Sequence, residues 1–330
     1  MRLVLAALLL LTSCGPSAPA AAGPITPAAS PSTSSVASAP RVASPTASPA
    51  PSVLGNCRLP VQMVGSAVGW LDVPGGTFEP DPTSVGRFST VDGSIAWDPV
   101  IAGWVPANAE SLSPDGTRYV SADTSATIDV IDARSGSTIA AIPPKYTSNL
   151  GVFFVLGYTP TDIYLVQGGK NPPPGLWKID TSSWALSQVT SQQADWSTVD
   201  GSTVWGGRDD AAGYGGIVRV DTSTGLVHEV RPPYETQFDL TIAGLAGSGV
   251  LVVSSPVGQS AEVVNADGTS QKVVVPQTIE RFDLGTPFQD GPDILFASSF
   301  GLVAYDPDQG FQLIVTRQDL FKILGPCIKE

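Results

Sequence analysis

The chain has 330 residues, of which 42% are hydrophobic and 14% charged, and it contains 34 glycines and 30 prolines. This turn-rich composition favours an all-β protein over a helical one. The formal net charge is −13, and the 17 lysine and arginine residues are scattered along the chain. Nucleic acid is therefore not an expected partner, because phosphate binding needs clustered cations.

The N-terminus has the pattern of an export signal. Arg2 is its one charged residue, and it precedes the apolar run Leu3–Leu11. A run this short cannot span a bilayer and predicts a signal peptide over residues 1–13.

Leu11-Thr12-Ser13-Cys14 resembles a bacterial lipobox, which implies cleavage before Cys14 and acylation of that cysteine by diacylglycerol and chains such as palmitate. An ordinary secretory signal with a chance cysteine is the alternative. The resemblance implies a lipoprotein anchored in the cell membrane on its extracytoplasmic side, at the cell surface, because paired acyl chains hold firmly.

A segment with almost no charge or bulky apolar side chains follows over residues 14–55. After Cys14 it consists mainly of Pro, Ala, Ser and Thr, with Arg41 as its single charge. Such a composition cannot offset the entropy lost on ordering, so it predicts a disordered linker. About 40 residues of flexible coil would span roughly 35–40 Å and lift the following domain away from lipid. A simple unconstrained leader, and linker glycosylation, both stay open.

The folded domain is expected over residues 56–330. Its clearest pattern of strands and turns lies in Asn108–Ile142. Ser113-Pro114-Asp115-Gly116 and Asp132–Gly136 carry typical turn residues between segments rich in β-branched and aromatic side chains. The unit is predicted to be a meander of four strands. Such a sheet has two apolar faces and must be stacked between neighbours. The expected strands are Ala109–Leu112, Arg118–Ala122, Thr127–Ile131 and Ser137–Ile142.

Two motifs of this unit carry a family resemblance. Leu112–Thr117, followed after a strand by Ile128–Asp132, is similar to the blade pattern of TolB-like and WD40-like β-propellers. The resemblance covers about a tenth of the chain and implies a β-propeller. It does not imply a particular ligand, because propellers serve many functions.

The second half of the pattern, an apolar strand ending in Asp or Asn at a turn, recurs along the domain. The spacing averages about 40 residues, which is the period of a four-stranded blade. Six turns predict six blades, and seven are the alternative, although a seventh would have to lie within Cys57–Thr90, which is short for a blade. The six strands end at Asp98, Asp132, Asp180, Asp221, Asn265 and Asp306.

Cys57 and Cys327 stand near the two ends of the predicted domain. Export to a compartment that permits disulfides predicts that they pair, and two unpaired thiols are the alternative. A closed propeller brings its first and last blades together, so the bond would staple the ends of the ring. The chain-entropy relation gives about 5 kcal/mol for so long a loop.

The sequence offers little catalytic chemistry. His228 is the only histidine and lies in a predicted outer strand. Without a second histidine or a spare cysteine, the usual transition-metal site cannot be assembled, and no nucleophile elbow, phosphate-binding loop or dinucleotide fingerprint occurs. Asp306–Gly310 partly matches a calcium loop, but Arg317 stands where that loop needs glutamate, so a blade turn is predicted. We therefore assign no catalytic residue, metal or cofactor.

Aromatic residues are the remaining candidates for ligand binding. They cluster in the third and fourth repeats near the loop Gly168–Gly175, where exposed rings could stack on sugars or anchor a protein, and packing inside the blades is the alternative. Acidic residues in the loop Gly206–Gly216 could face a ligand or a cation, or could be solvated. The candidates are Trp177, Trp196, Trp205, Asp209, Asp210 and Tyr214.

The function expected from these patterns is that of a membrane-anchored, extracytoplasmic propeller that acts as a binding or scaffold module for a protein partner. We expect a monomer. Binding of cell-wall or extracellular glycan through the aromatic cluster is the alternative. A propeller enzyme of the lyase, glycosidase or lactonase type is a third hypothesis.

Overall fold

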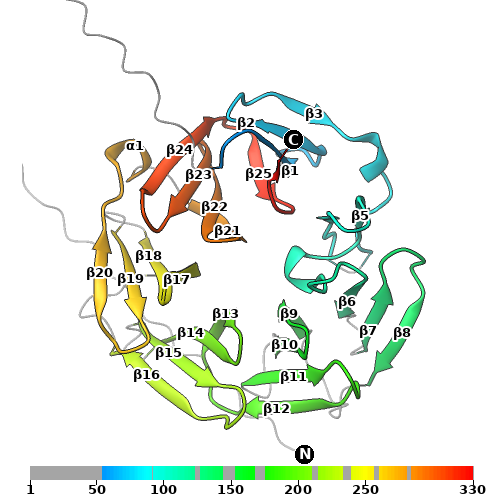
Figure 1. Cartoon of the computed structure of the whole chain (residues 1–330), viewed down its shortest axis with the longest axis vertical. Helices are drawn as coiled ribbons and strands as arrows, with labels where there is room; N and C mark the ends of the chain where they lie inside the picture. The colour runs from blue at the N-terminus through cyan, green and yellow to red at the C-terminus, as the bar shows by residue number, and fades with distance from the viewer. Residues whose placement is uncertain are drawn as a thin grey trace, which may run out of the picture. The chain divides into compact units, whose positions relative to one another are not determined.

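The computed structural model describes residues 54–90, 92–122, 127–143, 153–167, 175–209, 215–232, 239–255, 260–280 and 284–329. The predicted signal peptide, Cys14 and almost all of the linker lie outside these ranges. In the domain the sheets follow one another around a ring, with one strand of each blade near the centre and another at the rim (Figure 1). The predicted all-β propeller is confirmed.

Blades 3 to 6 each run outward in chain order through four antiparallel strands. Blade 3 consists of β9 (Phe153–Tyr158), β10 (Asp162–Gln167), β11 (Leu176–Asp180) and β12 (Leu186–Thr190). Blade 4 consists of β13 (Asp195–Asp200), β14 (Thr203–Asp209), β15 (Gly215–Asp221) and β16 (Val227–Arg231). Blade 5 consists of β17 (Asp239–Ala246), β18 (Gly249–Ser255), β19 (Ser260–Asn265) and β20 (Ser270–Val273). After the short helix α1 (Gln277–Glu280), blade 6 consists of β21 (Leu284–Asp290), β22 (Asp293–Ser298), β23 (Gly301–Asp306) and β24 (Gly310–Thr316).

Blade 1 joins the two ends of the domain. Its strand order is β25-β1-β2-β3, so a strand from the end of the chain pairs with the first one, and Val61 stands opposite Ile323. A further strand pairs with β1 at Cys57. The strands are β25 (Leu320–Ile323), β1 (Cys57–Met63), β2 (Val68–Val73), β3 (Phe78–Pro80) and β26 (Ile328–Lys329).

Blade 2 has three regular strands and an irregular inner edge. The predicted strand Ala109–Leu112 is instead a 3-10 turn, η2 (Ala109–Ser111), followed by an isolated bridge between Leu112 and Tyr119. This bridge supplies the inner position and completes the sixth four-stranded blade of the described ring. The regular strands are β6 (Arg118–Ala122), β7 (Ile128–Asp132) and β8 (Thr138–Ile142).

The Asp98 turn does not belong to a four-stranded blade. It ends β4 (Ala96–Asp98), which pairs only with β5 (Gly103–Val105) in a two-stranded sheet between blades 1 and 2 (Figure 1). The first blade lies instead in the stretch Cys57–Pro80, where the sequence predicted no blade. That prediction was wrong because the fourth strand of this blade comes from the other end of the chain. The total of six four-stranded blades is nevertheless confirmed.

The hydrophobic core lies between the blades. Middle strands such as β22 contain runs of buried residues, because neighbouring sheets cover both of their faces. One cluster joins blade 1 to blade 6 through Leu59, Leu71 and Leu295, all fully buried. Apolar packing therefore holds blade 1 against blade 6, where the ring closes, as it holds the other neighbouring blades together.

The disulfide Cys57–Cys327 is formed, with the two Cα atoms 5.7 Å apart and a sequence separation of 270 residues. Cys327 N donates a hydrogen bond of 2.9 Å to Asp290 Oδ2 of blade 6. The predicted staple between the ends of the ring is confirmed.

Candidate functional site

The centre of the ring contains a cavity of about 680 Å³. It is larger than a groove of about 460 Å³ between blades 5 and 6. The inner strands β9, β13, β17 and β21 form much of its wall, and hairpin β4–β5, blade 2 and the segment after β25 complete it. Strands or connecting segments from all around the ring therefore contribute to this central cavity, which is the funnel of the propeller.

One side of the wall is fixed by a side-chain amide. Gln289 Oε1 accepts a hydrogen bond of 2.8 Å from Leu245 N, so β21 is joined to β17. Gln289 Nε2 donates to Gly291 O at 2.8 Å. A Cβ atom at Gly244 would clash with Gln289 Oε1, so a side chain at this position would displace the Gln289 amide from its hydrogen bonds. Gln289 holds the wall rather than offering free donors to a ligand.

The lining is mainly apolar, and its polar groups are chiefly hydroxyls such as those of Thr198 and Thr241. Among the described lining residues, Glu110 of η2 is the only charged one, and it is exposed. No described lysine, arginine or histidine forms an ion pair with it within 4.0 Å. The cavity therefore presents a single negative charge in apolar surroundings.

Three tryptophans gather where hairpin β4–β5 meets blade 1. The Trp97 ring meets that of Trp70 edge to face, with centroids 4.7 Å apart, and meets that of Trp104 in the same way at 5.2 Å. Trp97 is partly buried and lines the central cavity, whereas Trp104 is buried in the core. We call Trp70, Trp97 and Trp104 the tryptophan cluster. Nothing in the local sequence marks these three residues as a group, because their proximity depends on the packing of the hairpin against blade 1.

The Asp81 carboxylate binds two of the three indole groups of the tryptophan cluster. Its Oδ2 accepts hydrogen bonds from Trp70 Nε1 at 3.1 Å and Trp104 Nε1 at 3.0 Å. Its Oδ1 accepts from Thr83 N at 2.9 Å, which caps the 3-10 turn η1 (Pro82–Ser84). Burial acts to raise the pKa of Asp81, but the hydrogen bonds from Thr83, Trp104 and Trp70 outweigh it and lower the pKa to about 2. The carboxylate stays charged and holds both indoles in place.

The tryptophan cluster already contacts one cation of its own chain. The Arg58 guanidinium carbon lies 5.3 Å from the centroid of the Trp70 ring. The same guanidinium pairs with the carboxylates of Glu79 and Asp72. This contact is the geometry in which an aromatic face attracts a cation.

The three tryptophans selected from the sequence lie in the packing between blades. Trp177 and Trp205 are each 2% exposed, and Trp196 is 4% exposed although it borders the central cavity. Their rings do not offer a free face to a sugar. Asp209 pairs with Gly215 through the backbone at the end of β14. Asp210 and Tyr214 lie outside the described residues.

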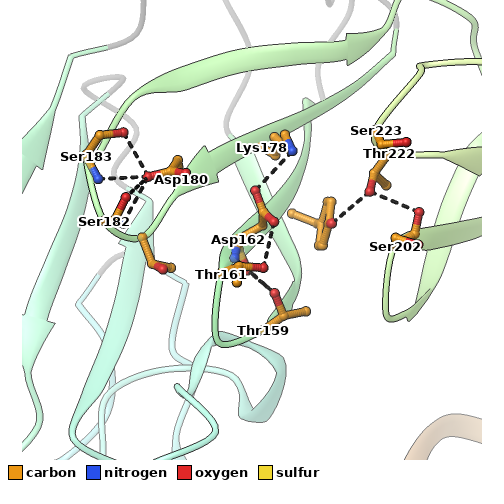
Figure 2. A network of polar contacts seen from close by, with 12 residues as sticks. Thr159, Thr161, Asp162, Lys178, Asp180, Ser182, Ser183, Ser202, Thr222 and Ser223 are labelled. Atoms are coloured by element: carbon orange, nitrogen blue, oxygen red, sulfur yellow. Dashed lines mark hydrogen bonds and ion pairs between the residues drawn. The ribbon is translucent and has the colours of Figure 1, made fainter.

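The aspartates at the blade turns have structural roles, as Figure 2 shows for Asp180 of blade 3. Asp180 Oδ1 accepts hydrogen bonds from Ser182 N at 3.0 Å and Ser183 N at 2.8 Å. Hydrogen bonds from the side chains of Ser182 and Ser183 hold the pKa of Asp180 well below its usual range. Asp306 accepts in the same way from Asp308 N and Gln309 N, which confirms that Asp306–Gly310 is a blade turn.

A second set of contacts in Figure 2 ties blade 3 to blade 4. Tyr164 Oη and Thr222 Oγ1 lie 3.1 Å apart, and Thr222 Oγ1 donates to Ser202 O at 3.0 Å. Within blade 3, Lys178 Nζ pairs with Asp162 Oδ1 at 3.1 Å. These polar groups satisfy one another, so the network stabilises the junction between the blades.

The described residues contain no group of three or more His, Cys, Asp or Glu side chains that could hold a metal ion. His228 is exposed on the outer strand β16, as predicted. Within the described ranges, no helix has the length and hydrophobicity needed to cross a membrane.

Comparisons with known proteins yield fold similarity only. No family model and no curated protein sequence matches the chain. Hydrazine synthase of Kuenenia stuttgartiensis is similar to it, with 14% identity, a TM-score of 0.46 and 80% of each chain covered. BamB from Moraxella catarrhalis has 14% identity and a TM-score of 0.42, covering 76% of this chain and 69% of that chain. A protein described as TolB from Agrobacterium tumefaciens has 14% identity and a TM-score of 0.44, covering 62% and 73%.

Proposed function

We propose that the chain is a lipid-anchored binding module on the extracytoplasmic side of the cell membrane, and that a protein partner enters its central cavity. The observation that carries this proposal is the cavity itself, which is formed by segments from all around the ring and lined mainly by apolar residues. Its volume lies within the range of about 300–1,000 Å³ that is usual for ligand clefts. A concave apolar surface with a few fixed polar groups suits the binding of a peptide segment.

The proposed location is supported by two features of the chain. The Cys57–Cys327 disulfide suits an oxidising compartment outside the cytoplasm. The sequence Leu11-Thr12-Ser13-Cys14 supports export and acylation of Cys14. Both features are expected of a protein that works on the extracytoplasmic side of the membrane.

A protein partner is favoured over a glycan by the placement of the aromatic residues. The glycan hypothesis relied on Trp196 and Trp205, and both rings are buried in blade packing. Sugar binding by stacking needs exposed ring faces. We therefore propose a protein-binding function.

A photo-crosslinking amino acid placed at Thr241 tests this function in intact cells that produce the full chain. Thr241 is exposed on β17 and lines the central cavity. We expect irradiation to join the chain to one discrete protein, seen as a band of defined mass that mass spectrometry identifies. The same amino acid at Leu226, which is 60% exposed in the turn before β16 at the rim, is the control and should not capture that protein. Absence of a protein adduct at Thr241, or equal capture at both positions, would contradict the proposal.

Substituting Cys14→Ser tests the anchor separately. Removal of the acylated sulfur should move the protein from the membrane fraction to the soluble fraction, because acyl chains would provide its hold on the bilayer. Cell fractionation and the intact mass of the N-terminal peptide measure the two consequences. A wild-type chain that carries Cys14 without acyl groups, or a variant that stays in the membrane fraction, would be inconsistent with lipid anchoring.

A further inference from the structure

The residues that line the central cavity indicate which chemical groups a partner would present to it. Glu110 is the only charged side chain among its described lining residues, and it has no ion-pair partner among them. A nearby cation, Lys322, donates to Asn108 Oδ1 at 2.9 Å and is not among the lining residues. The Glu110 carboxylate is thus free to meet a positive charge that arrives with a ligand. Such an attraction is stronger beside apolar walls than in bulk water.

A second group suited to a cation faces the same cavity. Trp97 belongs to β4, and β4 contacts η2, the turn that carries Glu110. Its ring is braced by Trp70 and Trp104, whose indole nitrogens are held by Asp81. A fixed tryptophan ring and a carboxylate that line the same cavity, on elements in contact, form a preorganised receptor for an ammonium or guanidinium group. The Arg58 contact with Trp70 shows that the tryptophan cluster accommodates a guanidinium over a ring face, 5.3 Å from the ring centroid.

The charge of the chain also selects against acidic ligands. No lysine or arginine is among the described lining residues, and the formal net charge of the chain is −13. An acidic segment would be repelled at long range and would lose hydration in the cavity without gaining a partner. A basic segment would be attracted from solution, which raises the rate of association.

Resting on the proposed function, we propose that the partner segment carries a lysine or arginine among apolar residues, and that its cation docks at Glu110 and Trp97 in the central cavity. The apolar neighbours of that residue contact the remaining wall, which includes Leu112 and Phe288. Glu110 and Trp97 are thus the residues that determine specificity for the partner.

Selection from a random eight-residue peptide library displayed on phage tests this inference on the detergent-solubilised full chain. Wild type and the variant Glu110→Gln are compared, with Glu229→Gln as the matched control. Glu229 is an exposed glutamate on the outer strand β16, paired with Arg208 Nη2 at 2.8 Å. Wild type and Glu229→Gln should enrich peptides with one or two basic residues flanked by apolar ones. A synthetic copy of the best peptide should bind Glu110→Gln at least tenfold more weakly than wild type.

Substitutions of Trp97 provide a second measurement. Trp97→Leu should weaken the peptide at least fivefold, whereas Trp97→Phe keeps an aromatic face and should retain part of the affinity. Thermal unfolding of each variant shows that it is folded under the binding conditions. Equal affinity of Trp97→Leu and wild type for the peptide would overturn the role of Trp97.

The outcomes of the selection separate this inference from the proposed function. Enriched peptides that lack basic residues, or that bind Glu110→Gln as tightly as wild type, would overturn the cation specificity. If peptides of either kind also block crosslinking from Thr241, the protein-binding function stands without the cation specificity. If no peptide is enriched, the cation specificity fails, and if Thr241 also captures no protein in cells, the protein-binding function fails with it.

Discussion

Replacing Cys57 and Cys327 together by alanine should lower the free energy of unfolding by about 2–5 kcal/mol, the usual cost of removing a native disulfide. The bond closes a loop of 270 residues, so its loss frees an unusually long stretch of the denatured chain. Denaturant unfolding followed by tryptophan fluorescence measures the change. Hydrogen exchange should rise first in β1 and β25, because these strands close the ring.

Reduction of the wild-type protein is the control for this substitution. Wild type with reductant should unfold at the same denaturant concentration as the double variant, and the double variant should not respond to reductant. A double variant as stable as the oxidised protein would mean that strand pairing and the core between blades 1 and 6 close the ring without help from the disulfide.

Trp205→Ala should lower the free energy of unfolding by about 3–5 kcal/mol, as truncation of a large buried aromatic residue usually does. Trp205 is 2% exposed and packs with Ile217, Val250 and Val264 in the core between blades 4 and 5. Its removal leaves a cavity that surrounding strands of two sheets cannot fill. Thermal or denaturant unfolding gives the size of the loss.

The exposed aromatic residue Phe321 provides the comparison. It is 59% exposed on β25, so Phe321→Ala should change stability by less than about 0.5 kcal/mol, as surface substitutions usually do. A folded Trp205→Ala variant of wild-type stability that had lost affinity for a ligand would contradict the structural role of Trp205 and restore it as a binding residue.

Much of the architecture was predictable because turn chemistry is local. An aspartate side chain that accepts hydrogen bonds from the amides two and three residues later forms the same turn wherever it occurs, as at Asp132, Asp180 and Asp221. The same signal also marked Asp98, whose Oδ1 accepts from Val100 N at 2.8 Å in a two-stranded hairpin. The motif therefore predicts a turn between two strands, whereas the number of strands in the sheet depends on further pairing.

The candidate site was less predictable than the fold. The disulfide partners could be deduced from their number and from the closure expected of a ring. Trp196 and Trp205 were plausible as exposed rings from their position near glycine-rich loops, yet both are buried. Trp97 and Glu110 gave no local signal, because they gain significance only by lining the same cavity.

The sequence by itself determined that the chain is all-β, that its strands recur with the period of a propeller blade, and that Cys57 and Cys327 stand at the ends of the domain. These properties depend on residue types and short spacings. Only the tertiary structure decided that blade 1 takes β25 from the end of the chain, and which aromatic rings are buried between blades. Both depend on contacts between residues far apart in sequence, whose free energy arises from packing whole sheets against one another.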